Sequence, residues 1–140
     1  MNKKVIVNVK SKQVIDGEDE KIELITTGKF YKKESSYFVV YDETEISGME
    51  GTTTTVKIDD DQVDLIRFGT ISAKLGFKKG KKDISLYKTP FGITELVINP
   101  SLVDINVGDE GGEVKLLYEL EMCGYNASSN ELYIKIQKSN

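Results

Sequence analysis

The sequence predicts an all-β protein whose strands close into one antiparallel up-and-down barrel of about eight to ten strands. Apolar residues recur at every second position through most of the 140 residues, which is typical of strands with one buried face. Short segments rich in glycine, asparagine and aspartate separate these runs. Connections this short cannot hold a crossover helix, so neighbouring strands are expected to pair antiparallel in chain order.

The first three strands are expected where the alternation is regular, in residues 5–9, 22–27 and 37–43. Tyr41 and Glu43 stay in phase with Val39, so the three side chains face the same side of the third strand. The turn segments "DGED" at residues 16–19 and "KKESS" at residues 32–36 supply the residue types that tight backbone requires.

The next hairpin contains "SGMEG" at residues 47–51, followed by four consecutive threonines at residues 52–55. Because neighbouring side chains of a strand point to opposite faces, Thr54 joins Val56 on one face, whereas Thr53 points to the other. Threonine is favoured in strands, so the run indicates a tight hairpin rather than a binding site. A polar pocket is the alternative for Thr54 alone, provided that the Val56 face points inward.

The later strands continue the alternation, with Ile84 and Leu86 as the apolar face of one of them. These strands are expected at residues 63–67, 71–77, 84–86, 96–98, 114–122 and 132–136. No segment has a helical apolar stripe with caps, so helix is expected only as a turn or two at the barrel ends. Alternation is weakest at residues 100–108, where a departure from strand is most expected.

Closure of the sheet follows from its edges. An open meander would leave two edge strands ready to pair with other chains, and a barrel removes both, so a barrel is favoured over a sandwich. A barrel of about eight strands either fills its interior with side chains or holds one small ligand. The pattern alone leaves both arrangements open.

Composition bounds the class of protein. A chain of 140 residues with 39% hydrophobic residues, 30% charged residues and a net charge of -4 fits a single domain over residues 1–140. The N-terminal apolar run is interrupted by Asn8 and Lys10, unlike a signal sequence, and no run is long enough to cross a membrane. The lone cysteine, Cys123, fits a reducing compartment. We therefore expect a cytoplasmic protein without a nucleic-acid or membrane partner, and the sequence leaves the oligomeric state open.

The absence of histidine is the most decisive feature for chemistry. It excludes Ser-His-Asp triads and zinc sites, and it leaves Cys123 without a base, so we expect this cysteine to be a packing residue. The acidic segments at residues 16–20 and 59–61 do not follow the spacing of a calcium loop. "GDEGGE" at residues 108–113 places acids where a phosphate loop needs backbone amides and a cation. We expect no enzymatic activity, no cofactor and no metal site.

The informative charged residues are those in phase with apolar ones. If Val63 and Leu65 face the core, Arg67 follows them inward, and Glu43 follows Tyr41. A guanidinium and a carboxylate enclosed in one barrel are expected to pair, because an unpaired buried charge is far more costly than a paired one. This pair has two interpretations, a buried network that fixes strand register and a polar anchor for an anionic ligand. The opposite strand phase, with Arg67 in solvent, is the remaining alternative.

Three segments of the sequence carry a resemblance to a known family. They are "YDETEISGMEGTTTTVKI" at residues 41–58, "VDLIRFG" at residues 63–69 and "LYKTPFGITELVI" at residues 86–98. With them the chain resembles the YwiB-like family of uncharacterised bacterial proteins from about residue 5 to residue 136. The resemblance implies a calycin-type, lipocalin-like barrel, and it implies no reaction. Calycin relatives often bind small apolar ligands, but fold does not determine function.

These observations favour a barrel that binds a small apolar or aromatic acidic molecule in its interior. The candidate binding residues are Tyr41, Glu43, Thr54, Arg67, Tyr87 and Tyr118. The tyrosines would form amphipathic walls, and the guanidinium would bind the acidic group, since its geometry matches a carboxylate. The alternative is a structural or protein-interaction barrel whose interior is filled by side chains and holds no ligand.

Overall fold

The computed structural model describes residues 2–122 and 128–139, and within them the chain forms ten strands and one short 3-10 helix. Over the same residues no helix is both long enough and apolar enough to span a membrane. Cys123, expected to be a packing residue, lies outside the described residues. The elements are β1 (Lys3–Ile15), β2 (Glu18–Lys33), β3 (Ser36–Asp42), η1 (Glu45–Ser47), β4 (Thr52–Ile58), β5 (Gln62–Gly69), β6 (Ala73–Lys78), β7 (Asp83–Thr89), β8 (Gly92–Gly108), β9 (Gly111–Met122) and β10 (Ser128–Lys138).

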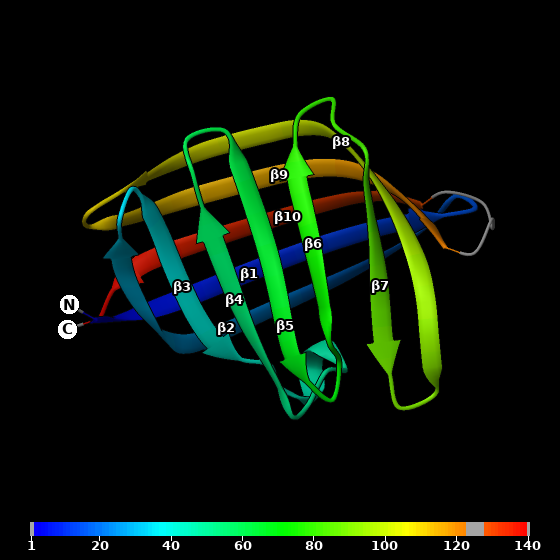
Figure 1. Ribbon diagram of the computed structural model, residues 1–140. Helices are drawn as coiled ribbons and strands as arrows, with labels where there is room; N and C mark the ends of the chain where they lie inside the picture. Colours follow the sequence, from blue (N-terminus) through cyan, green and yellow to red (C-terminus); the bar gives the residue numbers. More distant parts are fainter. Residues whose placement is uncertain (1, 123–127, 140) are drawn as a thin grey trace.

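All ten strands belong to one antiparallel sheet in the order β6-β5-β4-β3-β2-β1-β10-β9-β8-β7. Chain neighbours pair along this order, and the pair that departs from it joins β1 to β10, so the two chain ends lie side by side (Figure 1). β6 and β7 end the order and come together to close the barrel. The predicted all-β meander and its strand number are confirmed.

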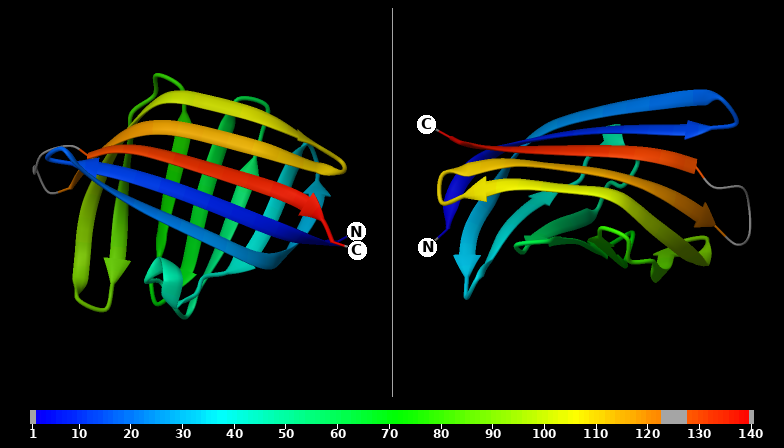
Figure 2. Two further views of the ribbon diagram at one scale, coloured as in Figure 1. Left: turned by 180° about the vertical axis from the view of Figure 1, so that it is seen from behind. Right: turned by 90° about the horizontal axis from the view of Figure 1, so that it is seen from above.

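The sheet folds over into two layers that enclose the core. Figure 2 shows the long strands β1, β9 and β10 in one layer and the shorter strands β3 to β7 in the other. The strands of the two layers cross at a steep angle (Figure 1). The shape is consistent with the calycin-type barrel that the family resemblance implied.

Two strands, β2 and β8, pass from one layer to the other. β2 pairs with β3 from Lys29 onward, and just before it an added Cβ atom at Gly28 would lie 2.7 Å from the Val40 carbonyl oxygen. β8 shifts register between Pro100 and Leu102. Proline has no N–H group to donate to a neighbouring strand, and a bulge of this kind accommodates it within the sheet. The segment with the weakest alternation is therefore a bent strand and not a helix.

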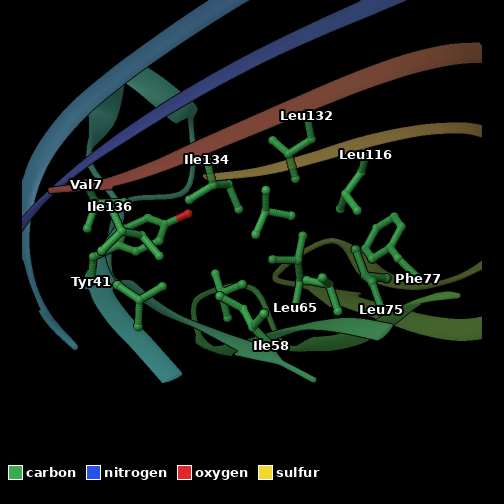
Figure 3. Packing of buried hydrophobic residues seen from close by; sticks show 14 of the residues in the cluster. Val7, Tyr41, Ile58, Leu65, Leu75, Phe77, Leu116, Leu132, Ile134 and Ile136 are labelled. Atoms are coloured by element: carbon green, nitrogen blue, oxygen red, sulfur yellow. The ribbon is translucent and has the colours of Figure 1, made fainter. Parts of the chain in front are cut away.

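Inward-facing side chains at alternate positions fill the space between the layers (Figure 3). In β4, Thr54 and Val56 are buried on the inner face, whereas Thr53 on the outer face is half-buried. Before this strand, the turn uses Gly48 and Gly51, whose φ angles of 76° and 81° favour glycine. The threonine run is thus one strand of a hairpin, as predicted, but residues 43–51 with η1 connect β3 to β4, so the hairpin is not a tight one.

The two predictions for β7 exclude each other, because an inward Ile84 and Leu86 would turn Tyr87, a candidate interior residue, outward. Ile84 and Leu86 are exposed, whereas Ser85 is buried and Tyr87 is half-buried. The Ser85 hydroxyl donates a hydrogen bond of 2.6 Å to the Lys74 carbonyl oxygen of β6. A polar residue is required there because β7 lies at the closing edge of the barrel, so the expectation that Ile84 and Leu86 face the core is wrong.

β6 and β7 meet at a seam, which backbone hydrogen bonds close at Ser72 and Lys88. These two residues exchange N–H···O bonds of 3.0 and 2.9 Å. Farther along the seam, side chains replace the backbone ladder. Asp83 Oδ2 accepts a hydrogen bond of 2.8 Å from the Gly76 N–H, and the Ser85 hydroxyl reaches the next β6 carbonyl. The barrel is therefore nearly closed, and side chains complete its closure.

Removal of the Asp83 carboxylate should weaken this seam. Asp83→Ala leaves the Gly76 N–H without its acceptor. We expect the free energy of unfolding to fall by about 1–2 kcal/mol, because the lost hydrogen bond has a charged acceptor and is partly exposed. Asp83→Asn is the matched control, because its amide oxygen still accepts, and its loss should be about half or less. Urea unfolding followed by circular dichroism measures both. Equal losses in the two variants would show that the hydrogen bond does not stabilise the seam.

Candidate functional site

Inward side chains lie in one row across the layer of short strands. The register pairs Tyr41 of β3 with Thr54 of β4, and Thr54 with Arg67 of β5. Opposed residues of antiparallel strands hold their Cβ atoms roughly 4.5–5.5 Å apart. Figure 3 shows Tyr41 directed into the core. The row therefore gathers a phenol, a hydroxyl and a guanidinium inside the barrel, and Arg67 has the inward phase that was predicted.

Glu43 is buried beside this row, just after the end of β3. Thr54 Oγ1 donates a hydrogen bond of 2.5 Å to Glu43 Oε2, and the Glu43 N–H donates one of 2.8 Å to the Thr52 carbonyl oxygen. The ion pairs among the described residues lie on the surface, and none joins Arg67 to Glu43. The predicted pair is therefore wrong. The threonine on the intervening strand binds the carboxylate that the guanidinium was expected to bind.

Arg67 is the only arginine of the chain. Its side chain is half-buried, and its Nε atom is buried without a hydrogen-bond partner among the described residues. A buried donor without a partner costs roughly 1–3 kcal/mol, because it has lost its bonds to water. An acceptor brought to this atom would recover part of that cost.

Two tyrosines lie close enough to Arg67 for its charge to act on them. Burial raises the pKa of Tyr41 above its ordinary value of 10.0, with the Glu43 charge adding to the rise and Arg67 opposing it. Burial also raises the pKa of Tyr118, again against the effect of Arg67. Tyr118 comes from β9 in the other layer and packs edge-on against Phe77, with ring centroids 4.8 Å apart. Both hydroxyls are therefore neutral groups at physiological pH.

A hollow of about 210 Å³, here called the inner hollow, lies at one end of the barrel interior beside Arg67. At this end the β1–β2 hairpin projects past the layer of short strands (Figure 2). Leucines form much of its wall, and charged side chains that reach solvent form its rim. The lining residues are Ser11, Lys12, Gln13, Glu20, Ile22, Leu65, Arg67, Leu75, Tyr118, Leu120, Asn130, Glu131 and Leu132.

Polar residues at the mouth of the inner hollow form a network that the sequence pattern did not reveal. The Asn130 side-chain amide donates to the Ser128 hydroxyl and carbonyl oxygens at 3.1 Å each, and the Gln13 amide donates to the Ser128 hydroxyl at 3.2 Å. Gln13 keeps the inward phase of Val9, and Asn130 keeps that of Leu132. Extending the inward phase into the strand ends would therefore have found both.

Tyr87 lies apart from the inner hollow. Its hydroxyl donates to Met49 Sδ at 3.9 Å, and it is not one of the lining residues. Of the other predicted residues, Arg67 and Tyr118 line the inner hollow. Tyr41 and Thr54 continue the row from Arg67, and Glu43 lies beside that row. Within residues 2–122 and 128–139, no group of three or more His, Cys, Asp or Glu side chains is arranged to hold a metal ion.

The fold and this site define a ten-stranded, nearly closed β-barrel protein with a polar row and a small hollow inside it. The chain belongs to the family described as "Domain of unknown function (DUF1934)", which matches residues 7–134. It is 29% identical over 118 residues to the uncharacterised β-barrel protein YwiB of Bacillus subtilis (strain 168), covering 84% of this chain and 82% of YwiB. The crystal structure of YwiB from Bacillus subtilis matches with a TM-score of 0.89 at 25% identity, covering 99% of this chain and 94% of that chain. The YwiB-like resemblance is confirmed.

The hydrogen bond between Thr54 and Glu43 should contribute measurably to stability. Thr54→Val keeps the shape of the side chain but leaves a buried carboxylate without its hydroxyl donor, so we expect a loss of about 1–3 kcal/mol in the free energy of unfolding. Thr53→Val is the matched control, because its hydroxyl bonds to exposed Asp42, and its loss should be within about 0.5 kcal/mol. Urea unfolding of both variants decides the matter. Similar losses would mean that the buried contact carries no special weight.

Stability should fall at alkaline pH because of the buried tyrosines. The unfolded chain releases its phenolic protons near pH 10, whereas Tyr41 and Tyr118 keep theirs in the folded state because their pKa values are raised. The folded state therefore binds more protons above about pH 10, and the free energy of unfolding decreases as pH rises. Urea unfolding at several pH values should show this decrease, with a shallower slope for Tyr41→Phe. Identical slopes would contradict the assignment of Tyr41.

Proposed function

We propose that this protein binds a compact acidic molecule in the inner hollow, with its acidic group at Arg67. The observation that carries the proposal is the place of Arg67 in the lining of the inner hollow, where its guanidinium has no ion-pair partner among the described residues. Arginine presents a planar fork of donors that matches a carboxylate or a phosphate. A bound acid would supply the acceptor that the barrel itself does not provide.

The surroundings of Arg67 favour an acid with an apolar or aromatic body. Leu65 and Leu75 line the inner hollow on the side of the short strands, and Tyr118 lines it from the other layer. The Glu43 carboxylate competes less for the guanidinium than the sequence suggested, because Thr54 holds it. The apolar wall and the one guanidinium within it thus support one acidic group on a small hydrophobic molecule.

The size of the inner hollow limits the ligand. Its volume of about 210 Å³ is smaller than the range of roughly 300–1,000 Å³ that is usual for sites of drug-sized ligands. A small aromatic carboxylate fits this volume better than a long fatty acid. The lining does not suggest a reaction on the ligand, since the chain has no histidine to act as a base. The proposal is therefore a binding protein and not an enzyme, and the single cysteine of the chain favours a cytoplasmic location.

A structural or protein-interaction barrel is the second candidate function. The observation in its favour is the packing of the interior outside the inner hollow, where Val39, Val56, Ile98 and Leu116 are fully buried. In this reading Arg67 and its neighbours only fix the register of the short strands. The two candidates differ in one measurable respect, the response of the protein to small acids.

Binding should be tested by thermal shift with a panel of small aromatic carboxylates and with a long-chain fatty acid. We expect a small acid to stabilise the wild type by about 2.7 kcal/mol at 100 times its Kd. Arg67→Met should abolish this stabilisation, because it keeps an unbranched apolar stem at this position and removes the donors. Lys29→Met is the matched control, since Lys29 is exposed on β2 and does not line the inner hollow, and it should retain binding.

Mass spectrometry of the extract from unfolded, purified protein complements the thermal shifts. A co-purifying small acid in the wild type that is absent from Arg67→Met would support the binding function. No co-purifying acid, together with melting temperatures that no acid changes, would reject it in favour of the structural barrel.

A further inference from the structure

The outer face of the long layer carries a groove of about 600 Å³, here called the outer groove. Four neighbouring strands, β2, β1, β10 and β9, form its floor (Figure 2). Its charged and aromatic side chains have the outward phase of these strands, opposite to that of the buried residues Leu24 and Ile134. The sheet therefore separates the outer groove from the inner hollow, although the two linings share strand segments.

Lysines gather in the outer groove. Lys10, Lys12, Lys21 and Lys115 line it against two glutamates, whereas the whole chain has a net charge of -4. Lys10 forms an ion pair of 3.7 Å with Glu23. The other three lysines form no ion pair with another described residue. Three cations are thus available to an anionic ligand.

The register sets two of these cations directly against each other. Lys12 of β1 lies opposite Lys21 of β2, and Lys12 is half-buried. Like charges at opposed positions destabilise a sheet, because their Cβ atoms lie only roughly 4.5–5.5 Å apart. An anion bound between the two ammonium groups would replace this repulsion by two attractions. A phosphate monoester suits the position, because it carries nearly two negative charges at neutral pH.

An aromatic ring lies next to this lysine pair. Tyr133 of β10 is half-buried in the outer groove, and the register places it between Lys10 and Lys115. Tyr133 is also the diagonal neighbour of Lys12, at a separation of roughly 7–8 Å. Nucleobases stack on aromatic side chains of this kind. The volume of the outer groove lies within the range of roughly 300–1,000 Å³ that is usual for small-molecule sites.

We propose that the outer groove binds a small molecule that carries a phosphate group and an aromatic ring, such as a nucleoside monophosphate. Lys12 and Lys21 bind the phosphate, and Tyr133 stacks on the ring. Glu131, which lies opposite Lys12 on its other side, opposes binding because its carboxylate repels the phosphate. A long polyanion is disfavoured, since beyond the outer groove it meets a chain of net negative charge. The site is separate from the acid site proposed at Arg67.

Isothermal titration calorimetry of the full chain with adenosine 5′-monophosphate at low salt tests this site. We expect a Kd on the order of 100 µM, and at least about tenfold weaker binding of adenosine and of inorganic phosphate, because each lacks one of the two contacts. Lys21→Met should raise the Kd about fivefold, whereas Glu131→Gln should lower it. Lys29→Met is the matched control and should change nothing, because Lys29 is an exposed lysine of the same strand that also lies opposite a lysine, Lys4, but outside the outer groove.

Tyr133→Leu tests the stacking contact, and it should raise the Kd for adenosine 5′-monophosphate to that for inorganic phosphate. Circular dichroism checks that each variant is folded, and Lys12→Met replaces Lys21→Met if the latter is not. Arg67→Met should leave the affinity for the nucleotide unchanged, since Arg67 does not line the outer groove.

Several outcomes would overturn the proposal. They are a wild type that does not bind the nucleotide, equal affinities for the nucleotide and inorganic phosphate, and equal weakening by Lys21→Met and Lys29→Met. A loss of binding in Arg67→Met would place the nucleotide in the inner hollow instead. Tighter binding of a single-stranded oligonucleotide than of the mononucleotide would show that the groove takes a polyanion, and it would overturn the proposal as well.

Discussion

The phase of β4 and β5 is the constraint on which the rest of the interior depends. Val56 and Ile58 of β4 and Val63 and Leu65 of β5 are buried on the inner face, and each contributes about 1.5–3 kcal/mol. Because side chains alternate along a strand, this phase also turns Thr54 and Arg67 inward. A slip of one residue would expose all four aliphatic side chains. Burial of the apolar residues therefore holds the Arg67 guanidinium in the barrel. The free-energy cost of removing this charge from water is offset by the apolar residues and not by contacts of the guanidinium.

The barrel reduces this cost only in part. It keeps the Arg67 side chain half-buried at the edge of the inner hollow and surrounds it with Tyr41 and Tyr118, but it directs the nearest carboxylate, Glu43, to Thr54. A buried arginine with a protein counter-ion would be a structural element alone. Arg67 instead lines a small hollow with leucine walls and has no ion-pair partner among the described residues, and the proposed binding function rests on this arrangement.

Most of the fold could be predicted from the sequence because alternation and short turns are local signals. The inward phase of Arg67 followed from Val63 and Leu65 in the same way. The partner of Arg67 could not be predicted, since two inward residues on different strands meet or miss according to register and side-chain rotamer. Here Thr54 lies on the strand between β3 and Arg67, and its hydroxyl donates a hydrogen bond to the Glu43 carboxylate.

The phase of β7 was missed for a related reason. Ile84 and Leu86 alternate with polar residues as a core strand would, but the seam with β6 requires the Asp83 and Ser85 side chains as hydrogen-bonding groups. That requirement comes from closure of the barrel by strands that are not paired along their length, which no local pattern records. As a consequence, the apolar side chains of β7 lie on the outer surface of the barrel and take no part in the inner site.

Arg67 lines the inner hollow, and its guanidinium has no ion-pair partner among the described residues. Since Arg67 is the only arginine of the chain, its Nε–H group gives a single arginine resonance in a nitrogen–proton correlation spectrum. We predict that a small aromatic carboxylate shifts this resonance downfield and slows its exchange with water, as hydrogen bonding to a charged acceptor requires. A resonance with the position and exchange rate of free arginine, unchanged by any acid, would contradict the account.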